Sequence, residues 1–500
     1  MDEMNLQWKT TILGGLLVLT AWVWSRPAPE LGDRCPVPAP AAVPPRPLPP
    51  ASRPANDLIR WLAIGGGSSP ELNQVSIEQD VALASTVLGA RHGVVLFAGG
   101  PRSRDVQVLT ERPPDEALLH ELGQLIAPRG GRDGRYRHSR LAIHGPTTFH
   151  RARREVRRLV GVGGPALTLL IAGHGERGQE ARDNWVGLWG GDRLTVVQLA
   201  RWLSAARRSV QLIVTACYGG GFAELAAPDR RTVASDGPLT CGLFATTHDL
   251  PASGCDPNPD REAQKGYAVH FFNALRGLDR SERPLPRAAL DFDGDGRISS
   301  LEAHGRVRIA SQGADVPTTT TEYWLRRFAP LRGPGTSVHL PEERAVVQAL
   351  VRLTGLRPEL TSLRDLLRQA ERLIADARDL RDRAATTEDE AARAAIAELL
   401  RRWPVLDDPW HPAFARTLAR RRASIVEHLR GSQRYGRFLA AQQETSQADE
   451  TYWELRRQAA PLERLVRALE NIELAGRLKR RGGARWARFG ALLACERGRR

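Results

Sequence analysis

The stretch Val210-Gln-Leu-Ile-Val-Thr-Ala-Cys-Tyr-Gly-Gly-Gly221 places an apolar run directly before a cysteine and three glycines. A second stretch, Ala166-Leu-Thr-Leu-Leu-Ile-Ala-Gly-His-Gly175, ends in a histidine between two glycines. Short apolar runs bounded by glycine are typical of strands buried in a parallel sheet. In open α/β sheets, ligands bind at the carboxyl ends of the strands. We therefore expect His174 and Cys217 to meet at one edge of such a sheet.

The chain around these two stretches alternates between the patterns of strands and helices. Besides 166–172 and 210–215, strands are expected at 60–65, 93–98 and 242–247, helices at 77–88, 147–159, 195–206 and 266–278, and a hairpin at 185–194. This alternation predicts an α/β domain over 57–335 with a mostly parallel sheet and helices on both faces. Glycines 65–67 follow the first strand without a phosphate-loop signature, so a tight turn is expected there.

The residue types at the two strand ends suit nucleophilic catalysis. A cysteine attacks as its thiolate, and a neighbouring imidazole can act as the base. The N–H groups of Gly175 and Cys217 could hold an oxyanion, and a helix opening at glycines 219–221 would favour the thiolate through its dipole. The structural alternatives are a buried thiol and a hydrogen-bonded loop histidine.

The two pairs His174-Gly175 and Ala216-Cys217 resemble the clan of caspase-like cysteine peptidases, which includes caspases, metacaspases and legumains. The bacterial legumain-like peptidases look closest. They share the glycine-rich turn after Cys217, a segment similar to Ser253-Gly254-Cys255, and an opening similar to 61–74 with Asn73-Gln74. Over about 57–330, the resemblance implies a caspase-like fold in which His174 is the base and Cys217 the nucleophile for peptide-bond hydrolysis.

One position departs from the family pattern. Thr215 stands two residues before the cysteine, where legumains and metacaspases carry an acid, so their preference for the residue before the scissile bond is not carried over. Acids in later loops could line a pocket for a basic substrate side chain; they are Asp236, Asp256, Asp260 and Glu262.

The segment 291–302 has the spacing of a calcium loop of the EF-hand type, D-x-D-x-D-G-x-x-x-x-x-E. Carboxylates would come from Asp291, Asp293, Asp295 and Glu302, a backbone carbonyl from Arg297, and a further oxygen from Ser299, directly or through water. An exiting helix is expected at 301–312, whereas prolines 284 and 286 leave only a stub before the loop. The spacing predicts a lone Ca²⁺ site that stabilises or regulates the peptidase; the alternative is a solvated acidic turn.

Composition limits the function classes. Of 500 residues, 42% are hydrophobic, which excludes whole-chain disorder. The net charge of +15 comes almost entirely from arginine, a bias that often follows genome composition, so no nucleic-acid partner is expected. Five cysteines without a C-x-x-C pair exclude a disulfide-dense scaffold and give no zinc signature. Cys241 and Cys255 either pair with each other or both stay free.

The N-terminal part has the pattern of a membrane anchor. The uncharged apolar run 10–24, with tryptophans at 8, 22 and 24, is read as an uncleaved anchor within 1–26; a cleaved signal peptide is the alternative. A proline- and alanine-rich spacer follows at 27–56. We expect a single-pass protein of a bacterial inner membrane, with most of the chain in the periplasm.

Residues 336–500 are rich in Leu, Ala, Arg and Glu and predict an antiparallel helical bundle. One apolar stripe has alternating spacings of three and four: Leu363, Leu366, Ala370, Leu373, Ala377 and Leu380. We interpret the arginines of this region as a solvated face. Alternatively, the region is a module that docks a protein partner, or an anionic lipid through the basic tail 477–500.

Together these features predict a membrane-anchored, calcium-binding, caspase-like cysteine endopeptidase that acts on a peptide or protein substrate. Two alternatives stay open: a catalytically silent caspase-like scaffold that binds proteins in a calcium-dependent way, and a transpeptidase that uses the same acyl-enzyme.

Overall fold

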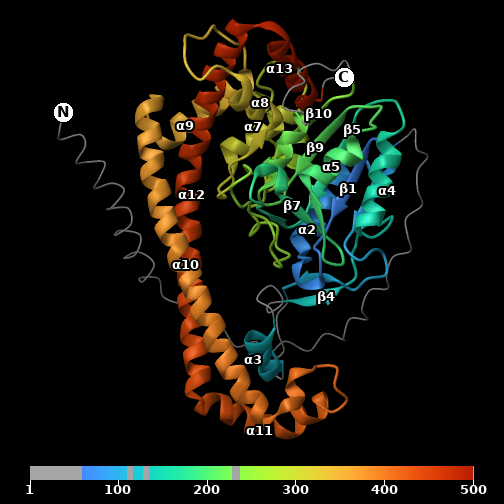
Figure 1. Cartoon of the computed structure of the whole chain (residues 1–500), viewed down its shortest axis with the longest axis vertical. Helices are drawn as coiled ribbons and strands as arrows, with labels where there is room; N and C mark the ends of the chain where they lie inside the picture. The colour runs from blue at the N-terminus through green and yellow to red at the C-terminus, as the bar shows by residue number, and fades with distance from the viewer. Residues whose placement is uncertain (1–58, 110–115, 128–133, 228–236, 499–500) are drawn as a thin grey trace, which may run out of the picture. The chain divides into compact units, whose positions relative to one another are not determined.

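The apolar runs that the sequence analysis assigns to strands pair into one six-stranded sheet (Figure 1), with the order β11-β10-β9-β5-β1-β2. Five strands are parallel, and the short edge strand β11 runs antiparallel to β10. The bounds are Trp61–Gly65 (β1), Gly93–Phe97 (β2), Leu167–Ala172 (β5), Val210–Val214 (β9), Thr240–Phe244 (β10) and Thr318–Thr319 (β11). The expected mostly parallel sheet is therefore confirmed, while β11 escaped prediction because two residues carry no periodicity.

The computed structural model describes residues 59–109, 116–127, 134–227 and 237–498. The predicted anchor at 1–26 and the spacer at 27–56 lie outside these residues. Within the described ranges, no helix combines the length and the apolar character needed to cross a bilayer.

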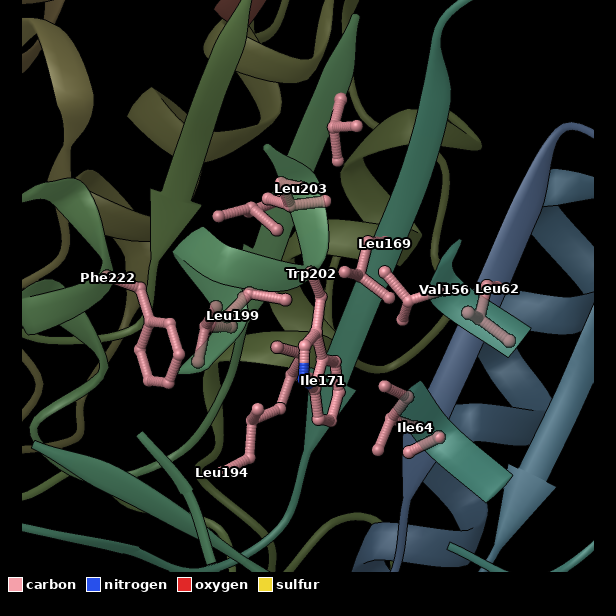
Figure 2. Packing of buried hydrophobic residues seen from close by; sticks show 14 of the residues in the cluster. Leu62, Ile64, Val156, Leu169, Ile171, Leu194, Leu199, Trp202, Leu203 and Phe222 are labelled. Carbon is pink, nitrogen blue, oxygen red and sulfur yellow. The ribbon is translucent and has the colours of Figure 1, made fainter. Parts of the chain in front are cut away.

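Helices cover both faces of the sheet, as the sequence predicts. Alternate strand residues point to opposite faces. One face packs on α4 (Phe149–Val160) and α5 (Val196–Leu203), and Figure 2 shows this core, with Trp202 lying among strand and helix side chains. The other face packs on α2 (Val75–Leu88), α6 (Tyr267–Leu275) and α7 (Ser300–Ala310).

Two small antiparallel sheets lie beside the main one. One contains β6 (Gly175–Glu176), β7 (Trp185–Leu188) and β8 (Asp192–Thr195), and the pair β7–β8 is the predicted hairpin. The other pairs β3 (Val106–Val108) with β4 (Arg135–Arg137). Since β6 begins directly after His174, the first of these sheets fixes the path of the chain that leaves the histidine.

The remaining helices comprise α3, which lies between β3 and β4 in the chain, and the helices that follow the sheet in a mostly helical region. They are α3 (Ala117–Ile126), α8 (Thr320–Phe328), α9 (Pro341–Thr354), α10 (Leu360–Arg402), α11 (Phe414–Gly431), α12 (Gln433–Arg481) and α13 (Gly483–Glu496). Six 3₁₀ segments complete the described chain: Pro70–Leu72, Ala90–His92, Ala181–Asp183, Gly219–Ala226, Arg287–Ala289 and Pro404–Asp407.

Helices α10 and α12 form the antiparallel pair that dominates this region (Figure 1). Leu363 near the start of α10 packs with Leu465 of α12, whereas Leu399 near its end packs with Phe438. At 1.5 Å rise per residue, the 43 residues of α10 span about 65 Å. The prediction of antiparallel helices is confirmed.

The stripe by which α10 contacts α12 differs from the predicted one. Leu363 and Ala377 are buried as expected, but Leu373 and Leu380 are each 50% exposed, and Ile374 is buried instead. The apolar residues of α10 form two overlapping stripes along the helix. The stripe that contains Leu367 and Ile374 is the one that packs against α12.

A disulfide joins the two regions of the described chain. Cys241 of β10 bonds to Cys495 of α13, across a sequence separation of 254 residues. Cys255 and Cys217 are free thiols. Both expectations for Cys241 and Cys255 are therefore wrong, because Cys241 pairs with Cys495 and Cys255 stays free. Residues 46–500 cluster as one compact unit, and the domain boundary expected near residue 335 stays a prediction.

Candidate functional site

His174 and Cys217 lie at the carboxyl ends of adjacent parallel strands, β5 and β9. Ile171 and Val214 are partners in the register of these strands, and the N–H of Thr215 donates to the carbonyl of Ile171 over 3.0 Å. Both side chains line a single cavity of about 410 Å³. The structure thus brings together the two residues that the sequence analysis selected.

Glycines allow the backbone around the two residues to pack closely. A Cβ atom at Gly175 would lie 2.0 Å from the carbonyl oxygen of Cys217, so no other residue fits between the two strand ends. A Cβ at Gly220 would lie 2.7 Å from the backbone nitrogen of His248. Tyr218 has φ +57°, a left-handed conformation that non-glycine residues rarely adopt. Such strain directly after Cys217 is typical of sites where the backbone presents a functional side chain.

The ring of His174 is held by two neighbours. Its Nε2 atom lies 2.8 Å from Oε1 of Gln74, and the backbone of Leu72 forms a further hydrogen bond. Burial lowers the pKa of His174 below its ordinary 6.5, and the Leu72 contact partly offsets this shift. The ring is therefore neutral at pH 7, which is the form that accepts a proton.

A buried network positions Gln74 itself. The side chain of the preceding residue, Asn73, accepts a hydrogen bond from the N–H of Gly67 and donates to the carbonyl and carboxylate of Asp105. Gln74 then begins α2 as its N-cap residue. In the sequence, Asn73-Gln74 stands out only as part of a family resemblance, so the orienting role of Gln74 is a finding of the structure.

The thiol of Cys217 contacts the backbone of Ala252. Its Sγ accepts from the Ala252 N–H at 3.2 Å and lies 3.4 Å from the Ala252 carbonyl oxygen. Burial raises the pKa of Cys217 to about 11; the Ala252 N–H lowers it, and the carboxylates of Asp315 and Glu176 raise it further. In this state burial therefore opposes the expected stabilisation of the thiolate. The glycines open only a 3₁₀ segment, and burial outweighs its dipole.

No hydrogen bond connects His174 to Cys217 among the residues that the structure describes. Catalytic hydrogen bonds are often long in free enzymes and shorten when substrate binds, so this geometry is compatible with a dyad. In the described state, the thiol is protonated and the imidazole is engaged with Gln74.

The cavity has walls from both the α/β region and the helical region. The loop 252–257 and residues 263–265 form one part, and Gly313 with Ala314 forms another. Trp453 and Arg457 of α12 close the remaining side. Sequence reasoning missed this wall, because nothing local connects residues 453 and 457 with a thiol at 217.

Arg464 of α12 fixes the part of the wall that contains Gly313 and Ala314. Its guanidinium is buried and donates to the carbonyls of Ser311, Gly313 and Asp315 over 2.7–2.8 Å. Breaking these bonds would leave buried carbonyls unpaired, which is costly. Helix α12 therefore both lines the cavity and supports its loop.

The acids expected to bind a basic substrate side chain are distributed differently. Asp256 lines the cavity. Asp260 and Glu262 are exposed and do not line it; the Asp260 carboxylate accepts the N–H of Glu262, and Glu262 accepts from Ser281. Asp236 lies outside the described residues. One of the four acids is thus placed at the cavity.

The loop 291–302 brings three of its expected ligands together. One carboxylate oxygen each from Asp291, Asp293 and Glu302 lies within 4.8 Å of the others. Asp295 lies outside this group, and its carboxylate accepts the N–H of Arg297. The cluster is thus smaller than the six-residue ligand set that the sequence predicts, which also includes Arg297 and Ser299.

Hydrogen bonds hold the carboxylates of this cluster. Glu302 is fully buried and accepts the N–H groups of Phe292 and Ser299, each over 2.7 Å. Asp291 accepts from Gly296 and from Arg287, whose hydrogen bond is the main reason that the pKa of Asp291 lies below its ordinary value. Its other oxygen, Oδ1, is buried without a hydrogen-bond partner among the described residues. A hard cation with oxygen ligands would satisfy this atom, so the residues fit Ca²⁺.

Comparison with known proteins adds no family assignment. No family model matches the chain, and no match among curated proteins was found.

Proposed function

We propose that the protein is a cysteine endopeptidase in which Cys217 is the nucleophile and His174 the general base. The observation that carries this proposal is the position of both side chains on one cavity, at the ends of adjacent parallel strands. The neutral imidazole, the glycine-flanked backbone and the left-handed Tyr218 support it. The resemblance of the His-Gly and Ala-Cys pairs to caspase-like peptidases supports the same reaction.

The reaction would proceed through an acyl-enzyme. As a substrate carbonyl approaches, His174 takes the thiol proton and Sγ of Cys217 forms a bond to the carbonyl carbon. The N–H groups of Gly175 and Cys217 would hold the oxyanion. His174 then gives its proton to the leaving amine as the C–N bond breaks. Finally it accepts a proton from the water that hydrolyses the thioester.

A library of fluorogenic peptides with varied residues before the scissile bond tests this proposal. We expect cleavage by the wild-type protein, and the preferred residue would show whether Asp256 selects a basic side chain. Absence of cleavage from every peptide, with and without calcium, would contradict it.

The raised pKa of Cys217 favours a second candidate, a silent scaffold that binds protein partners. A buried, protonated thiol is unreactive. Alkylation of Cys217 by iodoacetamide distinguishes the two candidates. It is measured with and without a peptide aldehyde whose sequence is that of a cleaved substrate. A peptidase should lose alkylation of Cys217 when the aldehyde is present. A scaffold should react slowly in both samples.

We further propose that the loop 291–302 binds Ca²⁺ through Asp291, Asp293 and Glu302, which would supply structural order and no chemistry. Helix α7 begins at this loop, and the chain after α7 forms the cavity wall at Gly313 and Ala314. Calcium bound at Glu302 can therefore affect the position of the cavity wall at Gly313 and Ala314 through the single helix α7 that connects them. This connection supports a stabilising or regulatory role.

Glu302→Gln is expected to weaken calcium binding by at least about tenfold, because it removes a charged ligand from a hard cation. Glutamine can still form the capping box with Ser299, so α7 keeps its start. Arg287→Ala should tighten binding, since Arg287 competes for Asp291. Titration calorimetry measures the calcium affinity of the wild type, of Glu302→Gln and of Arg287→Ala.

The matched control for Glu302→Gln is Glu371→Gln, on an exposed part of α10. Equal affinities in Glu302→Gln and Glu371→Gln would contradict the site.

Trp453→Ala is expected to raise KM for peptide substrates roughly tenfold with little change in kcat, because a large aromatic wall contributes binding and no chemistry. Steady-state kinetics give KM and kcat for Trp453→Ala and for the control Trp410→Ala. Trp410 lies outside the cavity lining, and an equal rise in KM for both variants would contradict the assignment.

A further inference from the structure

Helix α11 holds the most one-sided charge of the long helical region. It contains five arginines and a single acid, Glu427, whereas the neighbouring α10 contains nine arginines and nine acids. An arginine-rich genome would enrich both helices alike, so the imbalance is specific to α11. We call its arginines the arginine tip: Arg416, Arg420, Arg421, Arg422 and Arg430.

The fold presents the arginine tip to solvent. Ile425 and Leu429 are buried against residues of α10 and α12, including Leu399 and Phe438, and α3 joins the same cluster through Leu122. These contacts fix the inner face of α11. All five arginines of the tip are exposed. Figure 1 shows α11 at the lower end of the α10–α12 pair, beneath α3.

Most of these arginines have no counter-charge within the protein. Over the described residues, Arg416, Arg420, Arg421 and Arg430 form no ion pair and no side-chain hydrogen bond. By contrast, two arginines of the C-terminal segment are engaged within the protein. Arg477 donates to the carbonyls of Leu331 and Gly333, and Arg497 pairs with Glu342. Four cations of α11 are therefore available to an anionic partner.

A groove and an exposed indole complete the surface. The groove has a volume of about 740 Å³. Three arginines line it, with the apolar side chain of Val426 and one acid, Glu427; the arginines are Arg420, Arg422 and Arg430. Trp410 precedes α11 and is 92% exposed, although its turn is ordered by a 2.9 Å hydrogen bond from its N–H to Asp408. The turn thus holds the indole, an amphipathic ring, in solvent beside the arginines, where it is free to contact a partner surface.

We infer that the arginine tip and Trp410 form a docking surface for an anionic lipid bilayer. Arginine beside tryptophan suits the headgroup region, where cations meet phosphates and the indole lies at the polar boundary. A single-stranded nucleic acid also binds arginine and aromatic residues. The sequence pattern of a membrane anchor at 10–24 is a further feature that favours a bilayer over a nucleic acid. The inference does not depend on the proposed peptidase activity.

Sedimentation with vesicles of phosphatidylcholine, with and without phosphatidylglycerol, tests the surface. The protein used is residues 46–500, which form a compact unit and lack the apolar run that would bind vesicles by itself. We expect binding only when phosphatidylglycerol is present. Arg416→Glu/Arg420→Glu/Arg421→Glu should weaken binding by more than about tenfold, since each basic residue near an anionic surface contributes substantially.

The matched control is Arg372→Glu/Arg383→Glu/Arg393→Glu on exposed positions of α10, which makes the same change in net charge. It should leave binding within about twofold of the wild type. Trp410→Ala should weaken binding severalfold without affecting the fold, and Trp453→Ala should not. Equal losses in both triple variants, or no binding by the wild type, would overturn the inference. Binding to a single-stranded oligonucleotide in the absence of vesicle binding would also overturn it.

Discussion

Cys217→Ala is expected to abolish peptide hydrolysis, with a loss of kcat/KM on the order of a thousandfold to a millionfold. The thiol supplies the only bond to the substrate in the proposed reaction, and alanine leaves the cavity and the His174–Gln74 contact in place. His174→Ala should lose a similar factor. The double variant should be scarcely worse than either single one, because a nucleophile and its base act as a unit.

The matched control for this variant is Cys255→Ser. Cys255 is the other free cysteine of the described chain, and it lines the same cavity. It should retain most of the activity against the preferred library peptide. Equal activity in Cys217→Ala and wild type would contradict the assignment, as would a loss in Cys255→Ser as large as in Cys217→Ala.

The pH dependence of the wild type follows from the two pKa shifts. Burial lowers the pKa of His174, so the imidazole stays unprotonated until the pH falls below 6.5. The acid limb of kcat/KM should therefore lie below pH 6.5. Because the pKa of Cys217 is about 11 in the described state, thiolate is scarce at neutral pH, and activity there depends on proton transfer to His174.

Cys495→Ser is the second variant for which we expect a large effect, a destabilisation of roughly 5 kcal/mol in the chain-entropy account of a disulfide. The Cys241–Cys495 bond closes a loop across 254 residues, which greatly restricts the unfolded chain. Cys495 is only half-buried, so serine introduces little desolvation cost of its own. Urea unfolding of oxidised protein measures the change.

The segment around the disulfide should stay partly docked in this variant. The Glu496 carboxylate accepts the N–H and hydroxyl of Thr321, each over 2.6 Å, and Gln211 donates to the carbonyls of Cys495 and Glu496. We therefore expect faster proteolysis of α13 before global unfolding. The control is Cys255→Ser, which removes a thiol without a bond. Coincident urea transitions for the two variants would refute a stabilising role.

Much of the sheet could be predicted, because its signals are local. The buried strands β1, β2, β5 and β9 are short apolar runs bounded by turn residues, and parallel strands buried on both faces need that composition. β10 begins two residues before the predicted strand, at Thr240, because its apolar run contains Gly242 and carries no boundary signal. The antiparallel β11 has only two residues and could not be recognised.

The candidate site could be predicted in part. Strand ends at one edge of a sheet are brought together by topology, so His174 and Cys217 followed from the sequence. Gln74 and the α12 wall did not, since their contacts join residues far apart in the chain. The pKa of Cys217 also depends on burial by distant segments, which opposes the local dipole on which the prediction relied.

By itself, the sequence determined most of the strands, the alternation with helices, the places of His174 and Cys217 at strand ends and the spacing of the acidic loop. Backbone propensity and periodicity are local properties, so these features could be found without the fold. Only the tertiary structure decided which stripe of α10 faces α12, which cysteine pairs with Cys241, and what closes the cavity around Cys217. These choices depend on packing between elements that are hundreds of residues apart. In each case the sequence allows several partners, and the physical reason for the outcome is that only one arrangement buries the apolar faces of all these elements together.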